Sequence, residues 1–152
     1  MTVLRDEEMT EATMEGLKAI ARRWIEGGWQ QGRADMVDEL HAPHFVDHDS
    51  AGRTSDREGF KEGIIQLYAA FPDFHAVIED LVVDAAAMKV VVRWVANGTH
   101  RGTFMGIPPT GKRIAFQGIE IIRLEGERIV ERWGEWNGID LLEQLGGQSS
   151  CA

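Results

Sequence analysis

The stretch MKVVVRWVANGTHRGTFMGIPPTGKRIAFQGIEIIRL, residues 88–124, decides the fold that this sequence predicts. Its two ends, 88–97 and 113–124, are rich in β-branched apolar residues, which indicates two strands. The segment between them contains several glycines, which permit unusual backbone angles, and the adjacent Pro108 and Pro109, which stiffen the path. We expect an ordered loop that either forms the rim of a small-molecule pocket or only closes the core.

Two more strands flank this stretch. Residues 74–83 are expected to form a hairpin with 88–97, and residues 128–136 to form another with 113–124 around Glu125-Gly126. Apolar residues occupy both faces of 88–97, so we expect the sheet to be covered on both sides. Helices can cover one face and a second copy of the chain the other, which predicts a homodimer through the sheet.

The part of the chain before residue 74 is mainly helical in pattern. Apolar residues recur at helical spacing from Met14 to Ile25, and Thr10 or Thr13 can cap this helix. A short helix, a brief strand and a longer helix are then expected at 35–40, 44–48 and 55–71. Helices followed by long antiparallel strands are typical of an α+β fold, with helices packed on one side of a curved antiparallel sheet.

The composition limits the kind of protein. With 152 residues the chain is expected to form one domain, 1–152, with flexible tails at 1–10 and 147–152. Its formal net charge of −9 argues against a nucleic-acid partner and against binding to anionic membrane lipid. The single cysteine, Cys151, excludes an internal disulfide and a cysteine-based zinc site. The cytoplasm is the expected location.

Glu120 is a carboxylate on the apolar face of a predicted strand. Such a group must find a partner or raise its pKa, and a raised pKa suits a general acid or base. Simple pairing around Glu125-Gly126 places Glu120 opposite Glu131, so that two carboxylates would share a proton. A bulged turn would instead bring Glu120 close to Arg132 as an ion pair. Both registers are compatible with the sequence, and so is a purely structural salt bridge.

Two other polar groups are candidates for a site. His44 and His48 share one face of the predicted strand 44–48, but no third ligand has a spacing typical of a metal centre, so we expect no metal. His48 either lies at a pocket mouth or only hydrogen-bonds the helix layer. At the end of the last strand, Glu135 lies between two tryptophans. A flat apolar wall beside polar side chains fits a planar ligand, and it equally fits a core or an interface.

The sequence has no phosphate-binding glycine loop, no nucleophile elbow and no dinucleotide fingerprint. Catalysis, if present, is expected to be acid/base work without a cofactor.

With these strands, helices and polar residues, the chain resembles the SnoaL-like polyketide cyclase family, within the nuclear-transport-factor-2-like superfamily. The resemblance covers about residues 17–146, and its best-matching pieces are FVDH (45–48), AFPD (70–73), GTHRG (98–102), GIPPTGK (106–112) and LLEQLG (141–146). It implies a cone-shaped α+β barrel in which a bent antiparallel sheet wraps around helices and encloses a deep apolar pocket. It also implies the sheet-to-sheet dimer.

The resemblance further implies an intramolecular aldol condensation that closes a ring on an aromatic polyketide ester without metal or cofactor. Family cyclases use an aspartate near the end of the last strand, where this chain has Glu135 and Asn137. Glu120 or Glu135 is therefore the candidate base. His48, Arg132 or Asn137 is the candidate donor to the enolate oxygen. The candidate substrate-binding residues are Trp24, Phe45, Tyr68, Phe71, His100, Met105 and Trp136.

Three functions remain open at this point. The first is a cofactor-free lyase or isomerase that acts on a bulky apolar carbonyl compound. The second is a binding protein with the same pocket and no turnover. The third is a relative involved in polyketide hydroxylation or an epoxide-type hydrolase, for which Glu120, Glu131 and Arg132 would have to surround one water.

Overall fold

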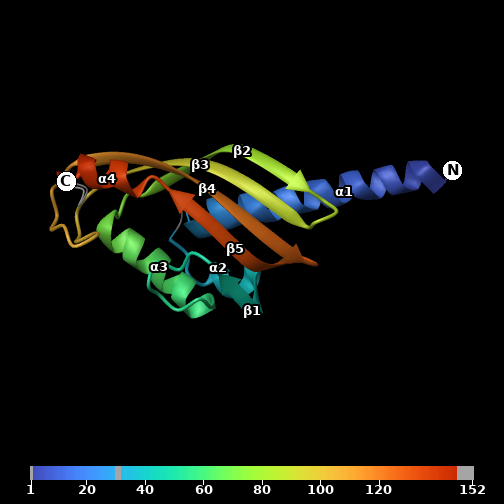
Figure 1. The fold of residues 1–152 in the computed structure, drawn as a ribbon, viewed down its shortest axis with the longest axis horizontal. Coiled ribbons are helices and arrows are strands. Elements are labelled where there is room, and N and C mark those ends of the chain that lie inside the picture. Colours follow the sequence, from blue (N-terminus) through green and yellow to red (C-terminus); the bar gives the residue numbers. More distant parts are fainter. Residues whose placement is uncertain (1, 30–31, 147–152) are drawn as a thin grey trace.

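The computed structural model of the chain describes residues 2–29 and 32–146 and has an α+β fold (Figure 1). The helical elements are α1 (Thr2–Arg22), the π-helical continuation η1 (Arg23–Trp29), α2 (Met36–Leu40), α3 (Arg57–Ala70) and α4 (Gly138–Gln144). The strands are β1 (His41–Asp47), β2 (His75–Asp84), β3 (Lys89–Thr99), β4 (Arg113–Glu125) and β5 (Arg128–Trp136). The predicted C-terminal tail, 147–152, lies outside the described residues.

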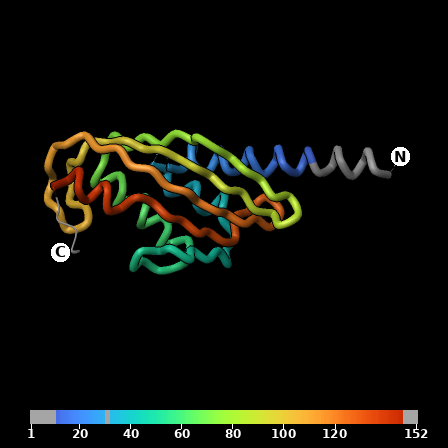
Figure 2. Tube along the Cα trace, turned by 45° about the horizontal axis from the view of Figure 1, so that its top comes forward, coloured from blue at the N-terminus to red at the C-terminus, as the bar shows by residue number. Residues whose placement is uncertain are grey.

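The strands form one curled sheet in the order β1-β5-β4-β3-β2. Strands β2 to β5 are antiparallel to their neighbours, as predicted, but β1 pairs with β5 in parallel. The sheet is therefore mixed, and it curls without closing into a complete barrel. Figure 2 shows the strands curving over helices α1 to α3, which gather on one side of the sheet.

Several predicted boundaries need correction. Helix α1 begins at Thr2, so Thr10 and Thr13 lie inside it and do not cap it, and residues 2–10, predicted to be a tail, have helical backbone. Strand β1 begins at His41 rather than His44. Helix α3 begins within two residues of its predicted start, and Asp56 caps it, because its side chain accepts a hydrogen bond from the Gly59 N–H at 2.9 Å.

The core lies between the inner face of the sheet and the helices. Alternate residues of β3, from Val90 to Ala96, are buried against this core, as a strand with one inward face requires. The outer face is more open, and Val77, Val82 and Ile119 are exposed there. No helix within the described ranges is both long and apolar enough to cross a membrane.

The loop between β3 and β4 is ordered, as predicted. The His100 N–H donates to the Lys112 carbonyl at 2.9 Å, and the Gly111 N–H donates to the His100 carbonyl at 2.8 Å. The His100 side chain is buried, and its Nδ1 lies 3.0 Å from the Thr110 hydroxyl. Phe104, in the middle of the loop, packs on Phe71 of the core. The loop thus closes one end of the core, and its Phe104 also lines the cavity described below.

Candidate functional site

A cavity of about 310 Å³ lies between the inner face of the sheet and the helices. Pockets that bind small molecules typically have volumes of about 300–1,000 Å³. Most of its wall is aromatic or aliphatic, and its rings come from Trp29, Phe74, Trp94, Phe104, Phe116 and Trp136. Its charged lining residues are Asp49, Arg53, Glu120, Arg132 and Glu135. The cavity is therefore apolar with a few convergent polar groups.

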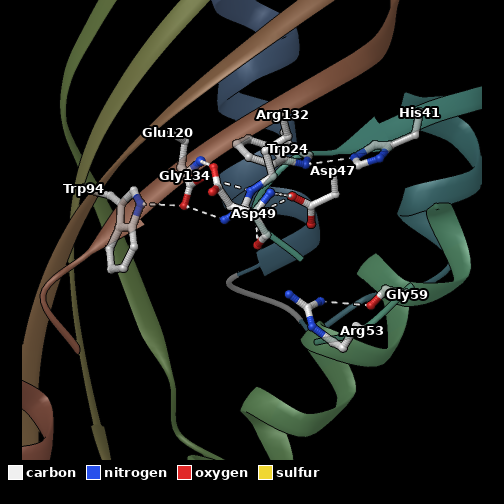
Figure 3. Close-up of polar contacts among 10 residues, drawn as sticks. All are labelled: Trp24, His41, Asp47, Asp49, Arg53, Gly59, Trp94, Glu120, Arg132 and Gly134. Atoms are coloured by element: carbon white, nitrogen blue, oxygen red, sulfur yellow. Dashed lines mark hydrogen bonds and ion pairs between the residues drawn. The ribbon is translucent and has the colours of Figure 1, made fainter. Parts of the chain in front are cut away.

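A buried triad of charged residues lies at this cavity (Figure 3). Arg132 on β5 donates from Nε to Glu120 Oε2 at 2.8 Å and from Nη2 to Glu120 Oε1 at 3.1 Å. Its third nitrogen, Nη1, donates to Asp47 Oδ1 at 2.9 Å. All three residues are buried, so one guanidinium is shared by two desolvated carboxylates. A buried charge requires such pairing, because hydration no longer stabilises it.

The register of β4 and β5 creates this triad. A bulge between Arg123 and Leu124 places Glu120 opposite Gly134 and Ile122 opposite Arg132. The bulged alternative predicted for the turn is therefore correct, and the pairing of Glu120 with Glu131 is wrong. Glu131 instead lies on the other face, where Oε1 accepts from Arg123 Nε at 2.7 Å.

Two glycines in the strands make room for the triad. A Cβ at Gly134 would lie 2.2 Å from Glu120 Oε2 and 2.4 Å from Arg132 Nη2. A Cβ at Gly118 would lie 2.4 Å from the Trp94 ring, whose Nε1 donates to Glu120 Oε1 at 3.3 Å. Glycine inside a strand often marks such a close approach. Glycines inside two predicted strands could have indicated this close packing from the sequence alone, but the prediction did not use them.

The segment after β1 ties the triad to the cavity mouth. The Asp49 N–H donates to Asp47 Oδ1 at 3.0 Å, and Asp49 Oδ2 accepts from the Gly134 N–H at 2.7 Å. The Asp49 carbonyl also accepts from Arg132 Nη1 at 3.2 Å. Asp47 Oδ2, in contrast, is buried and has no hydrogen-bond partner among the described residues. Sequence reasoning assigned no role to either aspartate.

Burial raises the pKa of Glu120 above that of an ordinary glutamate, and repulsion from Asp47 adds to this effect. Arg132 and the Trp94 N–H act in the opposite direction. Burial also lowers the pKa of Arg132, but the attraction of Glu120 and Asp47 outweighs it and the net change is upward. Because one cation cannot fully neutralise two buried carboxylates, we assign Glu120 the raised pKa.

The other predicted catalytic residues do not contact the triad. His48 is on the outer face of the sheet, where it stacks on Trp133 at 4.7 Å between centroids and its Nε2 lies 2.9 Å from Glu131 Oε2. Asn137 caps α4, because its side chain accepts from the Asp140 N–H at 3.1 Å. Glu135 is exposed at the edge of the cavity. Only Glu120 and Arg132 of the five lie together.

Most of the predicted substrate-binding residues do not line this cavity. Trp24 is in the core, where its Nε1 donates to His41 Nε2 at 3.0 Å. Met105 is half exposed on the loop. The residues that are packed away from the cavity lining are Phe45, Tyr68, Phe71 and His100. Of the seven predicted residues, Trp136 alone lines the cavity. The prediction failed for the others because sequence periodicity identifies a buried face but not the part of that face that borders a cavity.

The donor set does not suggest a metal centre. No cluster of three or more histidine, cysteine, aspartate or glutamate side chains within the described part of the chain is placed to hold a metal ion. The arginine between Glu120 and Asp47 occupies the position at which a cation between the two carboxylates would lie.

Comparison with known proteins gives the class of this protein. The family model described as SnoaL-like polyketide cyclase matches residues 19–145. The chain therefore belongs to the SnoaL-like polyketide cyclase family.

Particular relatives match this chain over most of their length. Nogalonic acid methyl ester cyclase of Streptomyces nogalater is 26% identical over 76% of this chain and 87% of its own. IdmH of Streptomyces antibioticus, a proposed polyketide cyclase, is 32% identical with a TM-score of 0.69 and covers 90% of this chain and 98% of its own. AclR of Streptomyces galilaeus, a proposed hydroxylase, is 25% identical with a TM-score of 0.77, and the match covers 88% of this chain and 97% of AclR.

Proposed function

We propose that this protein is a cofactor-independent acid/base enzyme that acts on a bulky, mostly apolar carbonyl compound. The reaction would be an intramolecular aldol-type ring closure or a related isomerisation, and Glu120 would move the proton. The observation that carries the proposal is a buried carboxylate with a raised pKa at an apolar cavity. Membership of a family whose relatives include a named cyclase supports the same reaction class.

The chemistry balances with the residues of this chain alone. Glu120 removes a proton from the carbon next to a carbonyl group, and the electron pair of the C–H bond becomes an enolate. The enolate carbon then attacks a second carbonyl of the same molecule, and the new alkoxide takes the proton back from Glu120. Each carboxylate oxygen can accept two hydrogen bonds, so Glu120 Oε2, which accepts one from Arg132, retains a free position for the proton.

This assignment accounts for the departure from the family pattern at the end of the last strand. Asn137, which stands where many relatives are expected to have an aspartate, caps α4 and carries no charge. In this proposal the acid/base function belongs to Glu120 on the neighbouring strand β4, with Arg132 and Trp94 holding its carboxylate in place. Arg132 is thus a positioning residue.

The experiment compares turnover of the wild-type protein with that of Glu120→Gln. Nogalonic acid methyl ester, the compound in a relative's name, is the first compound to test, with chromatographic separation of the ring-closed isomer. Loss of one positioned acid/base group is expected to lower the rate by about 10²–10⁴-fold. Glu131→Gln is the matched control, because it makes the same change on the outer face. Equal rates for wild type and Glu120→Gln would reject Glu120 as the catalyst.

Two other outcomes identify the alternative functions. Quenching of tryptophan fluorescence by the ester without turnover would describe a binding protein. Conversion of an aryl epoxide to its diol would describe a hydrolase, and one observation favours this second candidate. Arg132 lies between two carboxylates, as such a reaction requires, although the second carboxylate is Asp47 and not Glu131.

A further inference from the structure

Arg53 lines the cavity, and no ion pair with the described residues neutralises its charge, although Asp47 and Glu62 attract it from a greater distance. It is half-buried on the turn between β1 and α3, and its Nη1 donates to the Gly59 carbonyl at 2.9 Å. No carboxylate of the described residues lies within 4.0 Å of its guanidinium. In Figure 3 its guanidinium points toward the Asp47–Arg132–Glu120 triad. A partly desolvated cation without an ion pair beside a cavity indicates a role toward what enters that cavity.

The backbone before Arg53 adopts an unfavourable conformation that aims it inward. Ala51 and Gly52 both have positive φ angles, of 51° and 85°, and the Arg53 N–H donates to the Ser50 carbonyl at 3.0 Å. Two consecutive left-handed residues make a tight turn, and alanine rarely adopts this conformation. Strain of this kind often marks a functional site. Ala51 itself lines the cavity.

Helix α3 is shaped to receive the same segment. A Cβ at Gly63 would lie 1.9 Å from Arg53 Nη1, and a Cβ at Gly59 would lie 1.8 Å from the Thr54 carbonyl oxygen. Two glycines one turn apart weaken a helix interior. Here they let the turn and the Arg53 side chain lie directly on the helix. The strained turn and the two glycines of α3 are separate observations, and both fix the position of the Arg53 guanidinium.

The proposed reaction requires a donor to the oxygen that becomes negative, and the expected donors do not supply it. His48 lies on the outer face and Asn137 caps a helix. Four of the five N–H groups of Arg132 already donate, to Glu120, Asp47 and the Asp49 carbonyl, so its cation is committed to two carboxylates. We propose that Arg53 is the oxyanion donor of this cavity, which binds the carbonyl oxygen of the ligand and stabilises it as an enolate. This inference rests on the proposed function.

The charges of the cavity agree with this role. When Glu120 removes a proton, its negative charge moves to the ligand oxygen, so the total charge in the cavity does not change. Asp47 and Asp49 disfavour a ligand that is already anionic while Glu120 is ionised. Because Arg53 is not paired with Glu120, its cation favours the negative charge on the ligand oxygen over the same charge on Glu120. This stabilises the transition state relative to the ground state, which is the requirement for catalysis. The favoured ligand is a neutral ketone or ester with an acidic α-hydrogen.

Binding of an enolate mimic tests Arg53 without any turnover. The test uses the Glu120→Gln variant, whose amide imitates the protonated carboxyl. This variant is titrated with 4-nitrophenolate, an enolate mimic whose absorbance reports the ionised oxygen. It is also titrated with 4-nitroanisole, which is neutral. We expect Glu120→Gln, the parent of the variants below, to bind 4-nitrophenolate more tightly than 4-nitroanisole. Adding Arg53→Gln should weaken phenolate binding by at least about tenfold and change 4-nitroanisole binding by less than about twofold. Arg33→Gln, an exposed arginine substituted in the same way, is the control.

A second variant moves the guanidinium without removing its charge. Gly63→Ala places a Cβ against Arg53 Nη1 while favouring the helix, so phenolate affinity should fall as it does in Arg53→Gln. The inference is overturned if the parent does not prefer the phenolate, if Arg53→Gln weakens both ligands equally, or if either variant binds the phenolate like its parent. Because no step of this test requires turnover, a failure here is distinct from a failure of the Glu120→Gln rate experiment.

Discussion

Arg132 donates two hydrogen bonds to Glu120 although the two residues are not opposite each other in the sheet. Glu120 is paired with Gly134 and Arg132 with Ile122, so the guanidinium reaches diagonally across β4 and β5. The side chain passes over Gly134, where no Cβ blocks the contact. The ion pair therefore depends on a bulge and a glycine as much as on the two charged residues.

The contact over Gly134 predicts a large effect for a small substitution. Gly134→Ala should separate Glu120 from Arg132, because its Cβ would overlap with both side chains. We expect a loss of about 1–3 kcal/mol in the free energy of unfolding and a fall in activity like that of Glu120→Gln. Denaturant unfolding and the rate assay measure the two effects.

Gly16→Ala is the control for this substitution. Nothing lies within 4 Å of a Cβ at Gly16, which is inside α1, so alanine there should stabilise the protein by about 0.5–1 kcal/mol. A Gly134→Ala protein that is as stable and active as wild type would contradict the crowding argument.

Trp94 is predicted to tune the proton affinity of Glu120. The hydrogen bond from its Nε1 lowers the pKa of Glu120, in part opposing the rise caused by burial. Trp94→Phe removes this donor and keeps an aromatic ring in the wall, so the pKa of Glu120 should rise further. If Glu120 is the base, the rising limb of the pH–rate profile should move to higher pH. A lower rate with an unmoved limb would assign Trp94 a packing role only.

His41 is predicted to limit stability in acid. Burial, with repulsion from Arg132 and Arg57, lowers its pKa from 6.5 to about 3. The unfolded chain binds this proton below pH 6.5 and the folded chain does not, so stability is complete above pH 6.5 and is lost as the pH falls toward 3. The loss should reach roughly 5 kcal/mol, at about 1.36 kcal/mol per pH unit.

His41→Gln tests this pH dependence. The glutamine amide oxygen can accept the hydrogen bond from Trp24 Nε1 and does not titrate in this range. Urea unfolding at several pH values should give a flatter dependence between pH 6.5 and 3 for the variant than for wild type. Parallel curves would assign the acid sensitivity to other groups.

The outer face of the sheet is the surface for the homodimer that we propose. Val82 and Ile119 are 61% and 48% exposed there, on strands β2 and β4. Lysine at both positions should repel the facing copy and shift the protein to a monomer in analytical ultracentrifugation, with the fold intact by circular dichroism. A wild-type protein that sediments as a monomer at high concentration would reject the dimer.

The order and type of the elements were readable from the sequence. The two β-hairpins and helix α3 form as predicted, because alternating apolar residues and turn residues act over short stretches of chain. The predicted start of α1 was wrong, since a polar N-terminal segment can be helical without an apolar face. The parallel pairing of β1 with β5 was also not predictable, because a short strand does not show which edge it will join.

The sequence by itself determined the α+β architecture, the family and the presence of a carboxylate, Glu120, on an apolar strand face. Alternation along a strand makes such a residue visible without any knowledge of its neighbours. Only the tertiary structure decided that Arg132 and Asp47 surround Glu120, that His48 and Asn137 lie away from it, and that Arg53 lines the same cavity. Those contacts join residues far apart in the chain, and their geometry depends on a strand bulge and on packing over glycines, which no local pattern encodes.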